Sequence, residues 1–362
     1  MPWGSAATRA TALVASVVVL SLAAAGTAAT APDVARFSWK LTETGSEARL
    51  RGLDAVSRQV AWASGSEGTV LRTVNAGRRW VSVGPPGAGA LEFRDIEAFG
   101  RRLALILSVG TGDDARIYRT VNGGRSWGLV FRNPDESAFY DCMAFFNRRH
   151  GLALSDPVDG KFRILATEDG GQSWRVLPRA GMPRALAGEF AFAASGTCLV
   201  TVPGTRNAWF ATGGGAEARV FRSRDGGRTW SVATTPVRST ESGGIFSLAF
   251  RNVRNGLAIG GDFAVPDEAV DALALTSDGG KTWRLVGAGA PDGYRSGAAW
   301  VPGLPRTAIA VGPTGSDVTT DAGRTWTRFD TGSFDAVDCA ANAACWASGE
   351  AGRAARLVGA HD

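Results

Sequence analysis

The chain has 362 residues, with 39 Lys and Arg against 34 Asp and Glu, which gives a formal net charge of +5. Its two histidines, His150 and His361, are too few to expect a His-based metal centre or a Ser-His-Asp triad. The basic residues are scattered without a run or an interleaved aromatic patch, so no nucleic-acid partner is predicted. No glycine-rich segment has the spacing of a phosphate or dinucleotide loop, and no nucleotide cofactor, metal or other cofactor is expected.

The N-terminal segment has the pattern of a secretory signal peptide. One charge, Arg9, precedes an apolar run from Ala10 to about Ala25, and small residues continue through Ala31. The run is shorter than the roughly 20 apolar residues that a membrane-spanning helix needs. The sequence therefore predicts a signal peptide over residues 1–31, cleaved between residues 25 and 31, and an exported protein that is periplasmic or secreted.

The next predicted element is a short strand at residues 37–41, which contains Trp39 and has no other strands of its own repeat beside it in the chain. At the opposite end of the chain, residues 334–339, 345–348 and 353–358 are expected to form three strands. The strand at residues 37–41 is therefore expected to pair with the three C-terminal strands and to complete their sheet.

Between these two ends one small motif recurs six times, and each copy ends in a tryptophan. The fullest copy is Ser223-Arg224-Asp225-Gly226-Gly227-Arg228-Thr229-Trp230. A short Asp or Asn side chain bonds back to the following amides while glycines take the positive-φ positions, so each copy is expected to form the tip of a β-hairpin. The Asp or Asn and the Trp of the copies are Asn75 and Trp80, Asn122 and Trp127, Asp169 and Trp174, Asp225 and Trp230, Asp278 and Trp283, and Asp321 and Trp326.

The spacing of these copies predicts the fold class. Successive tryptophans lie 43 to 56 residues apart, within the range expected when each repeat is one four-stranded propeller blade. The three C-terminal strands and the strand at 37–41 would make one further blade. We therefore expect an all-β protein, a seven-bladed β-propeller of four-stranded antiparallel blades over residues 32–362, with the last blade closed by residues 37–41.

The four cysteines form an even set without metal-type spacing, which agrees with export. Cys339 and Cys345 flank a short turn between two predicted strands, where a disulfide is geometrically easy. Cys142 and Cys198 fall at matching positions in two neighbouring inner strands. They either pair across the blade interface or remain as two buried thiols.

The recurring motif resembles the Asp-box, or BNR repeat, of sialidases, sortilins and the photosystem II assembly factor family. The chain is most similar to the photosystem II stability and assembly factors and their exported bacterial relatives, because the phrase Gly256-Leu257-Ala258-Ile259-Gly260 leads into the motif ending at Trp283. The resemblance covers nearly the whole mature chain. It implies a non-enzymatic, chaperone-like platform, for which we expect an envelope or membrane-associated protein or a glycan as partner, and a monomeric state.

In a propeller, the loops that enter the inner strands converge around the axis on one face, here called the funnel face, and this face is the predicted binding site. The alternative is a structural role, because Asp at the start of a strand often bonds a neighbouring backbone amide. The residues predicted on the funnel face are Arg94, Tyr140, Asp156, Asp159, Glu189, Asp262, Tyr294 and Arg295.

Two glycosidase hypotheses compete with the scaffold. A sialidase needs three arginines and a tyrosine nucleophile, and the candidates are Arg51, Arg94, Arg295 and either Tyr140 or Tyr294. However, Phe93-Arg94-Asp95-Ile96 lacks the Arg-Ile-Pro signature of that family. An inverting glucanase needs two carboxylates roughly 6.5–9.5 Å apart, and the candidate pairs combine Asp156 or Asp159 with Asp262 or Glu268. No catalytic residue is assigned, and a non-enzymatic protein is expected.

Overall fold

The computed structural model describes residues 1–5 and 36–359, and residues Arg36 to Gly359 belong to one compact unit. Apart from short 3₁₀ turns such as η2 (Gly112–Asp114) and η3 (Arg179–Gly181), the regular structure of this unit is β-strand. The predicted signal peptide falls almost entirely on residues outside the described ranges, so it stays a prediction. Within those ranges, no helix has both the length and the apolar character needed to cross a membrane.

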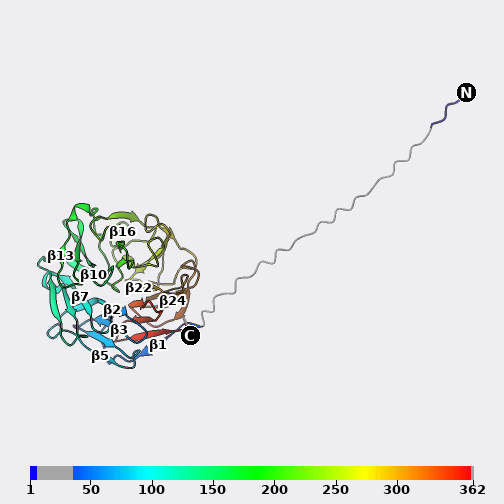
Figure 1. Ribbon diagram of the computed structural model, residues 1–362. Helices are drawn as coiled ribbons and strands as arrows, with labels where there is room; N and C mark the ends of the chain where they lie inside the picture. The colour runs from blue at the N-terminus through cyan, green and yellow to red at the C-terminus, as the bar shows by residue number, and fades with distance from the viewer. Residues whose placement is uncertain (6–35, 360–362) are drawn as a thin grey trace. The chain divides into compact units, whose positions relative to one another are not determined.

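The strands follow one another along the chain in sets that each build one antiparallel sheet (Figure 1). Their bounds are β1 (Ser38–Thr42); β2 (Leu50–Ala55), β3 (Ala61–Gly65), β4 (Val70–Thr73) and β5 (Trp80–Ser82); β6 (Glu92–Ala98), β7 (Ala104–Thr111), β8 (Arg116–Thr120) and β9 (Gly128–Arg132); β10 (Phe139–Phe145), β11 (Gly151–Val158), β12 (Lys161–Thr167) and β13 (Arg175–Val176); β14 (Leu199–Thr201), β15 (Ala208–Ala211), β16 (Arg219–Ser223) and β17 (Ser231–Thr234); β18 (Gly243–Phe250), β19 (Gly256–Asp262), β20 (Leu273–Thr276) and β21 (Arg284–Leu285); β22 (Gly297–Trp300), β23 (Ala308–Gly312), β24 (Gly315–Thr319) and β25 (Thr327–Asp330); and β26 (Ala336–Cys339), β27 (Cys345–Ser348) and β28 (Ala354–Val358).

The pairing of these strands joins the two ends of the unit. β1 pairs antiparallel with β28 along its whole length, so the sheet of β26, β27 and β28 gains its fourth strand from the start of the unit. In Figure 1 the blue strands of the N-terminal part accordingly lie beside the red strands of the C-terminal part. A second link joins the sheets β6–β9 and β10–β13, because Phe139 and Tyr140 of β10 pair with the end of β7.

The first strands of the sheets contact one another in chain order, from β2 through β6, β10, β14, β18 and β22 to β26, and β26 contacts β2. Hydrophobic clusters lie between successive sheets, and one of them joins the last sheet to the first through Trp346, Leu50 and Leu53. Second strands such as β3 and β15 are buried throughout, whereas fourth strands such as β13 are exposed. Sheets that stack face to face bury their middle strands in this way. The all-β architecture of four-stranded antiparallel sheets is confirmed.

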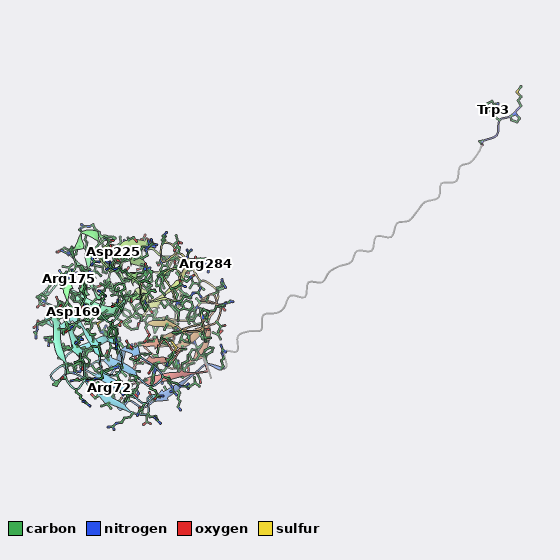
Figure 2. All side chains as sticks on the ribbon, in the orientation of Figure 1. Trp3, Arg72, Asp169, Arg175, Asp225 and Arg284 are labelled. Carbon is green, nitrogen blue, oxygen red and sulfur yellow. A yellow bond between two sulfur atoms is a disulfide. The ribbon has the colours of Figure 1, made fainter. Side chains whose placement is uncertain are left out.

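The six repeated motifs form the predicted hairpin tips, which connect the third and fourth strands of six sheets, and they are called repeat turns below. In every copy the Asp or Asn side chain accepts a hydrogen bond from the amide four residues further on, for example from Thr229 to Asp225 at 2.9 Å. Figure 2 labels two of these carboxylates, Asp169 and Asp225. The predicted bond from the Asp or Asn side chain to the following amides is therefore confirmed.

Both cysteine pairs form disulfides. The Cys142–Cys198 bond links β10 to the residue that precedes β14, across a Cα–Cα distance of 6.3 Å. The Cys339–Cys345 bond closes the hairpin of β26 and β27, across 4.0 Å. The first pair settles the alternative that the sequence left open, because the thiols of neighbouring sheets are bonded rather than free.

Candidate functional site

The funnel face carries an open groove of about 520 Å³ beside the sheets β10–β13 and β14–β17. Two of the predicted residues, Asp156 and Glu189, line it together with Phe190 and Glu241. Asp156 lies near the end of β11, where a bulge in the pairing with β12 interrupts the regular alternation of side chains. The remaining groups come from the long connection before β14, from Gly214 in the loop between β15 and β16, and from the loop before β18, so four loops of the funnel face build the groove.

Among the described residues, the Asp156 carboxylate has one hydrogen-bond donor. The Ala191 amide donates to it at 2.8 Å. Burial raises the pKa of Asp156 to about 7, although the Ala191 bond acts in the opposite direction. Close to it, Asp141 is buried and neither of its carboxyl oxygens has a partner in hydrogen-bonding geometry. Burial raises the pKa of Asp141 well above its usual range, and the Asp156 carboxyl raises it further.

Arg94 lies near this carboxyl pair but is bound to another residue. Its guanidinium forms an ion pair with Glu92 at 2.6 Å, and a second, long contact of 3.5 Å reaches the Ala193 carbonyl. Its positive charge lowers the pKa of Asp141, against the effect of burial. Arg94 is therefore a partly exposed cation close to Asp141, and it is not among the residues that line the groove.

Glu189 forms the fixed wall of the groove. Its side chain is buried and makes a two-pronged ion pair with Arg219 of β16, with 2.8 Å between Arg219 Nε and Glu189 Oε1. The Thr212 hydroxyl and the Leu186 amide also donate to it, at 2.7 and 2.8 Å. All of its acceptor capacity is used inside the protein, so Glu189 supports the groove rather than offering a free carboxylate to a ligand.

Three other predicted residues lie below the surface. Tyr140 is buried against Phe131, and burial raises its pKa to about 12. Arg295 is buried and donates from Nε to Asp317 Oδ2 at 2.6 Å. Tyr294 is almost fully buried, and burial raises its pKa well above the usual value. The structure therefore does not bring these three residues into the groove.

The last two predicted residues lie apart from Asp156. Asp159 is exposed and forms a surface ion pair with Arg179 at 3.0 Å. Asp262 lines a separate small pocket with Glu268 and accepts hydrogen bonds from the hydroxyls of Thr240 and Ser242, both at 2.6 Å. The carboxylates considered for a glucanase pair therefore lie in different surroundings, and Asp159 and Asp262 are each engaged by neighbouring side chains.

A cluster of aromatic rings at the groove was not predicted as a unit. Phe192 stacks on Phe246 with ring centroids 3.8 Å apart, and Phe190 packs against Phe192 at 4.8 Å. Tyr294 completes the buried side of this aromatic cluster, and Phe263, which is 55% exposed, lies on its open side, 6.5 Å from Phe192. Phe190 and Phe192 alternate with other residues in an irregular connection, so no strand periodicity marked them as neighbours.

A second unpredicted group is a set of carboxyls on the first strands. The same register of β2, β6 and β26 is occupied by Asp54, Glu97 and Asp338. The sequence contains this repetition, and it could have identified the three carboxyls as equivalent. Asp54 accepts from the amide of Ala98, and Asp338 accepts from that of Ala55, both at 2.7 Å. These bonds tie one first strand to the next. In the described ranges, no group of three or more His, Cys, Asp or Glu is arranged to hold a metal ion.

Scans against protein-family models and curated proteins find no match. Among solved structures, YCF48 from Cyanidioschyzon merolae matches with a TM-score of 0.62 and 15% identity, over 88% of this chain and 98% of that one. The structure described as YCF48 bound to D1 peptide matches with a TM-score of 0.60 and 14% identity, over 88% and 94%. A GH74 xyloglucanase from Xanthomonas campestris matches with a TM-score of 0.60 and 16% identity, over 88% of this chain and 53% of that one.

These likenesses define the class of protein. At identities of 16% and below they show a shared fold and no more, and that fold is the β-propeller. The chain is therefore a β-propeller with a groove and an aromatic cluster on its funnel face.

Proposed function

We propose that this chain is a seven-bladed propeller of Asp-box repeats, closed by β1, and an exported, non-enzymatic scaffold that binds a segment of an envelope protein on its funnel face. The blade count is supported by the sets of strands and by the contact between β26 and β2. Export is supported by the two disulfides, which form and persist in oxidising compartments.

The observation that carries the proposed function is the groove with its aromatic cluster. Phe190 lines the groove and Phe263 is exposed at the edge of the same cluster, while Asp156 and Glu241 place carboxyls beside them. Exposed aromatic surface next to fixed polar groups is typical of a protein-binding surface. The groove suits an extended segment with an apolar side chain for the aromatic cluster and a Lys or Arg for the carboxyls.

The comparison with known structures supports the same proposal. One of the similar propellers is a YCF48 structure with a bound D1 peptide. The alternative is a glycoside hydrolase, which the likeness to a GH74 xyloglucanase keeps open. A hydrolase of that kind needs two free carboxyls facing one bond. Here Glu189 is paired with Arg219 and Asp262 is bonded by two hydroxyls, an arrangement that favours the scaffold.

The test is affinity capture from the envelope fraction of the source organism with wild type and the Phe263→Ala/Glu241→Gln double variant. Val253→Ala is the matched control, because Val253 is an exposed apolar residue in the loop between β18 and β19, at the opposite end of its sheet. We expect an envelope protein that wild type and the control retain and the double variant loses. Shortening of added oligosaccharides by wild type, abolished in Asp156→Asn, would instead establish the hydrolase.

A further inference from the structure

Three sheets carry a tryptophan at one shared register of the second strand. The pairs across to the third strand are Trp62 with Arg72, Trp209 with Arg222, and Trp346 with Arg356. In each case the indole Nε1 donates to a backbone carbonyl of the neighbouring sheet. The acceptors are Gly100, Gly279 and Ser57, at distances of 3.0, 2.9 and 3.0 Å.

In two of the pairs the arginine also contacts the neighbouring sheet. The guanidinium of Arg72 lies over the Trp62 ring at 5.4 Å and donates to the Arg101 carbonyl at 2.8 Å. Arg222 donates to the Gly279 carbonyl at 3.3 Å, the same oxygen that accepts from Trp209. A flat ring with an N–H donor therefore occupies this position between sheets in three of the seven cases, and a repeat-turn carbonyl is one of its acceptors.

The sheet β10–β13 lacks such a pair. Leu152 of β11 lies opposite Ala166 of β12 at this register. This is the smallest pair at the register, since the other sheets have Leu105 with Arg119, Leu257 with Leu275, and Ile309 with Val318. A cavity of about 300 Å³ is present here, with Phe146, Leu152 and Ala166 among its lining residues. Its volume is at the lower end of the range for small-molecule pockets.

The far wall of the cavity contains the counterpart of the Gly279 carbonyl that accepts from Trp209. Gly226, in the repeat turn of the next sheet, occupies the position that Gly279 has in its own turn. Gly123, which follows Asn122, has the same position in its repeat turn as Gly226. A Cβ built on Gly123 would lie 1.9 Å from the guanidinium of Arg72, so an arginine already fills that space. A Cβ built on Gly226 would meet nothing within 4 Å, so the equivalent space here is open. Leu152 and Ala166 have no N–H group in their side chains, so the sheet β10–β13 supplies no side-chain donor to the Gly226 carbonyl at this register.

The rim of the cavity is cationic. Arg206, Arg228, His150 and Glu168 line it, and Arg228 forms an ion pair with Glu168 at 3.5 Å. Cations at the rim attract the face of an aromatic ring and oppose a second guanidinium. A neutral ring with an N–H donor therefore fits the cavity better than an arginine side chain does.

We propose that this cavity binds an indole, either as a free small molecule or as the exposed tryptophan of another polypeptide. The ring occupies the space above Leu152 and Ala166, and its N–H donates to the Gly226 carbonyl, as Trp209 does to Gly279. This site lies at the repeat-turn end of the sheets, so it is separate from the groove on the funnel face and independent of the function proposed for that groove.

The proposal is tested by titrating the purified, disulfide-intact protein with indole and with N-acetyltryptophanamide, using ligand-observed NMR. We expect saturable binding of at least one probe, lost in both Leu152→Trp and Ala166→Leu, which enlarge the pair at this register toward those of other sheets. Tighter binding of N-acetyltryptophanamide identifies a polypeptide as the source of the ring, and tighter binding of indole a small molecule. No binding of either probe, or binding retained in a folded filling variant, would overturn the proposal.

Two further measurements examine the contacts of the ring. Replacing indole by 1-methylindole removes the donor, and we expect about three- to ten-fold weaker binding, as for the loss of one hydrogen bond. Arg206→Ala should weaken binding by about two- to five-fold through loss of a cation beside the ring. Arg254→Ala is the matched control, because the backbone carbonyls of Arg206 and Arg254 each accept a hydrogen bond from the repeat-turn amide of their own sheet. This control variant should bind indole as wild type does. Equal affinities for indole and 1-methylindole would contradict the assigned geometry.

Discussion

Two carboxyl groups at opposite ends of the sheets, Asp169 and Asp156, are held in opposite ways. At the repeat turns, burial acts to raise the pKa of Asp169, but the Ser173 hydroxyl and several amides outweigh it and bring the pKa down to about 2. At the funnel face, burial raises the pKa of Asp156 to about 7, and a single amide opposes it. The same side chain is thus a stable anion where many donors surround it and a carboxyl that is about half protonated at pH 7 where few do. Asp169 is engaged by donors of its own repeat turn, whereas Asp156 accepts one hydrogen bond from a backbone amide, and the proposed partner would use the acceptor capacity that Asp156 retains.

The largest effect on stability is expected at the buried ion pair below the groove. Glu189→Ala leaves Arg219 buried without its partner, and we expect a loss of about 3–5 kcal/mol in the free energy of unfolding, measured by chemical denaturation. Asp159→Ala breaks the exposed pair with Arg179 and should cost about 1 kcal/mol or less. Equal losses in the two variants would show that Glu189 does not support the groove.

A smaller effect is expected at the repeat turns. Asp225→Ala removes the acceptor of two backbone amides and two hydroxyls, and should cost about 1–2 kcal/mol of unfolding free energy, as for the loss of a helix cap. Asp225→Asn should cost about 0.5 kcal/mol or less, since Asn75 and Asn122 occupy this position in two natural copies. If the Asn variant is as unstable as the Ala variant, the charge and not the hydrogen bonds holds the turn.

The dependence of stability on pH separates the two ends. Because the pKa of Asp156 is raised from its unfolded value to about 7, the folded state binds the extra proton between about pH 4 and 7, and stability contributed by this group falls as pH rises through that window. Asp156→Asn should therefore flatten the stability profile by up to about 1.4 kcal/mol per pH unit between pH 4 and 7 and leave the slope below pH 4 unchanged. For Asp169 the sign is opposite, and its contribution is lost as pH falls from about 4 to 2. A flatter profile below pH 4 in the Asp156 variant would contradict the assignment.

The turns could be predicted from the sequence because their bonds are local: Asp225 and Thr229 lie four residues apart, and the motif contains both donor and acceptor. The burial of the residues predicted on the funnel face could not be predicted in the same way. Arg295 meets Asp317, 22 residues further on, and Glu189 meets Arg219, 30 residues further on, so the sequence distinguishes neither from an exposed charge. The proposed indole cavity depends on the small pair of Leu152 and Ala166, which has meaning only once the register of all the second and third strands is known.

Site-specific photo-crosslinking tests the central claim, a protein-binding funnel face, most directly. A photoreactive phenylalanine analogue is placed at Phe263 in one variant and at Val253 in the other, and each is activated in the envelope of the source organism. We predict that the variant at position 263 forms a covalent adduct with an envelope protein and that the variant at position 253 does not. Adducts of the same protein from both positions, or from neither, would contradict a binding site on the funnel face.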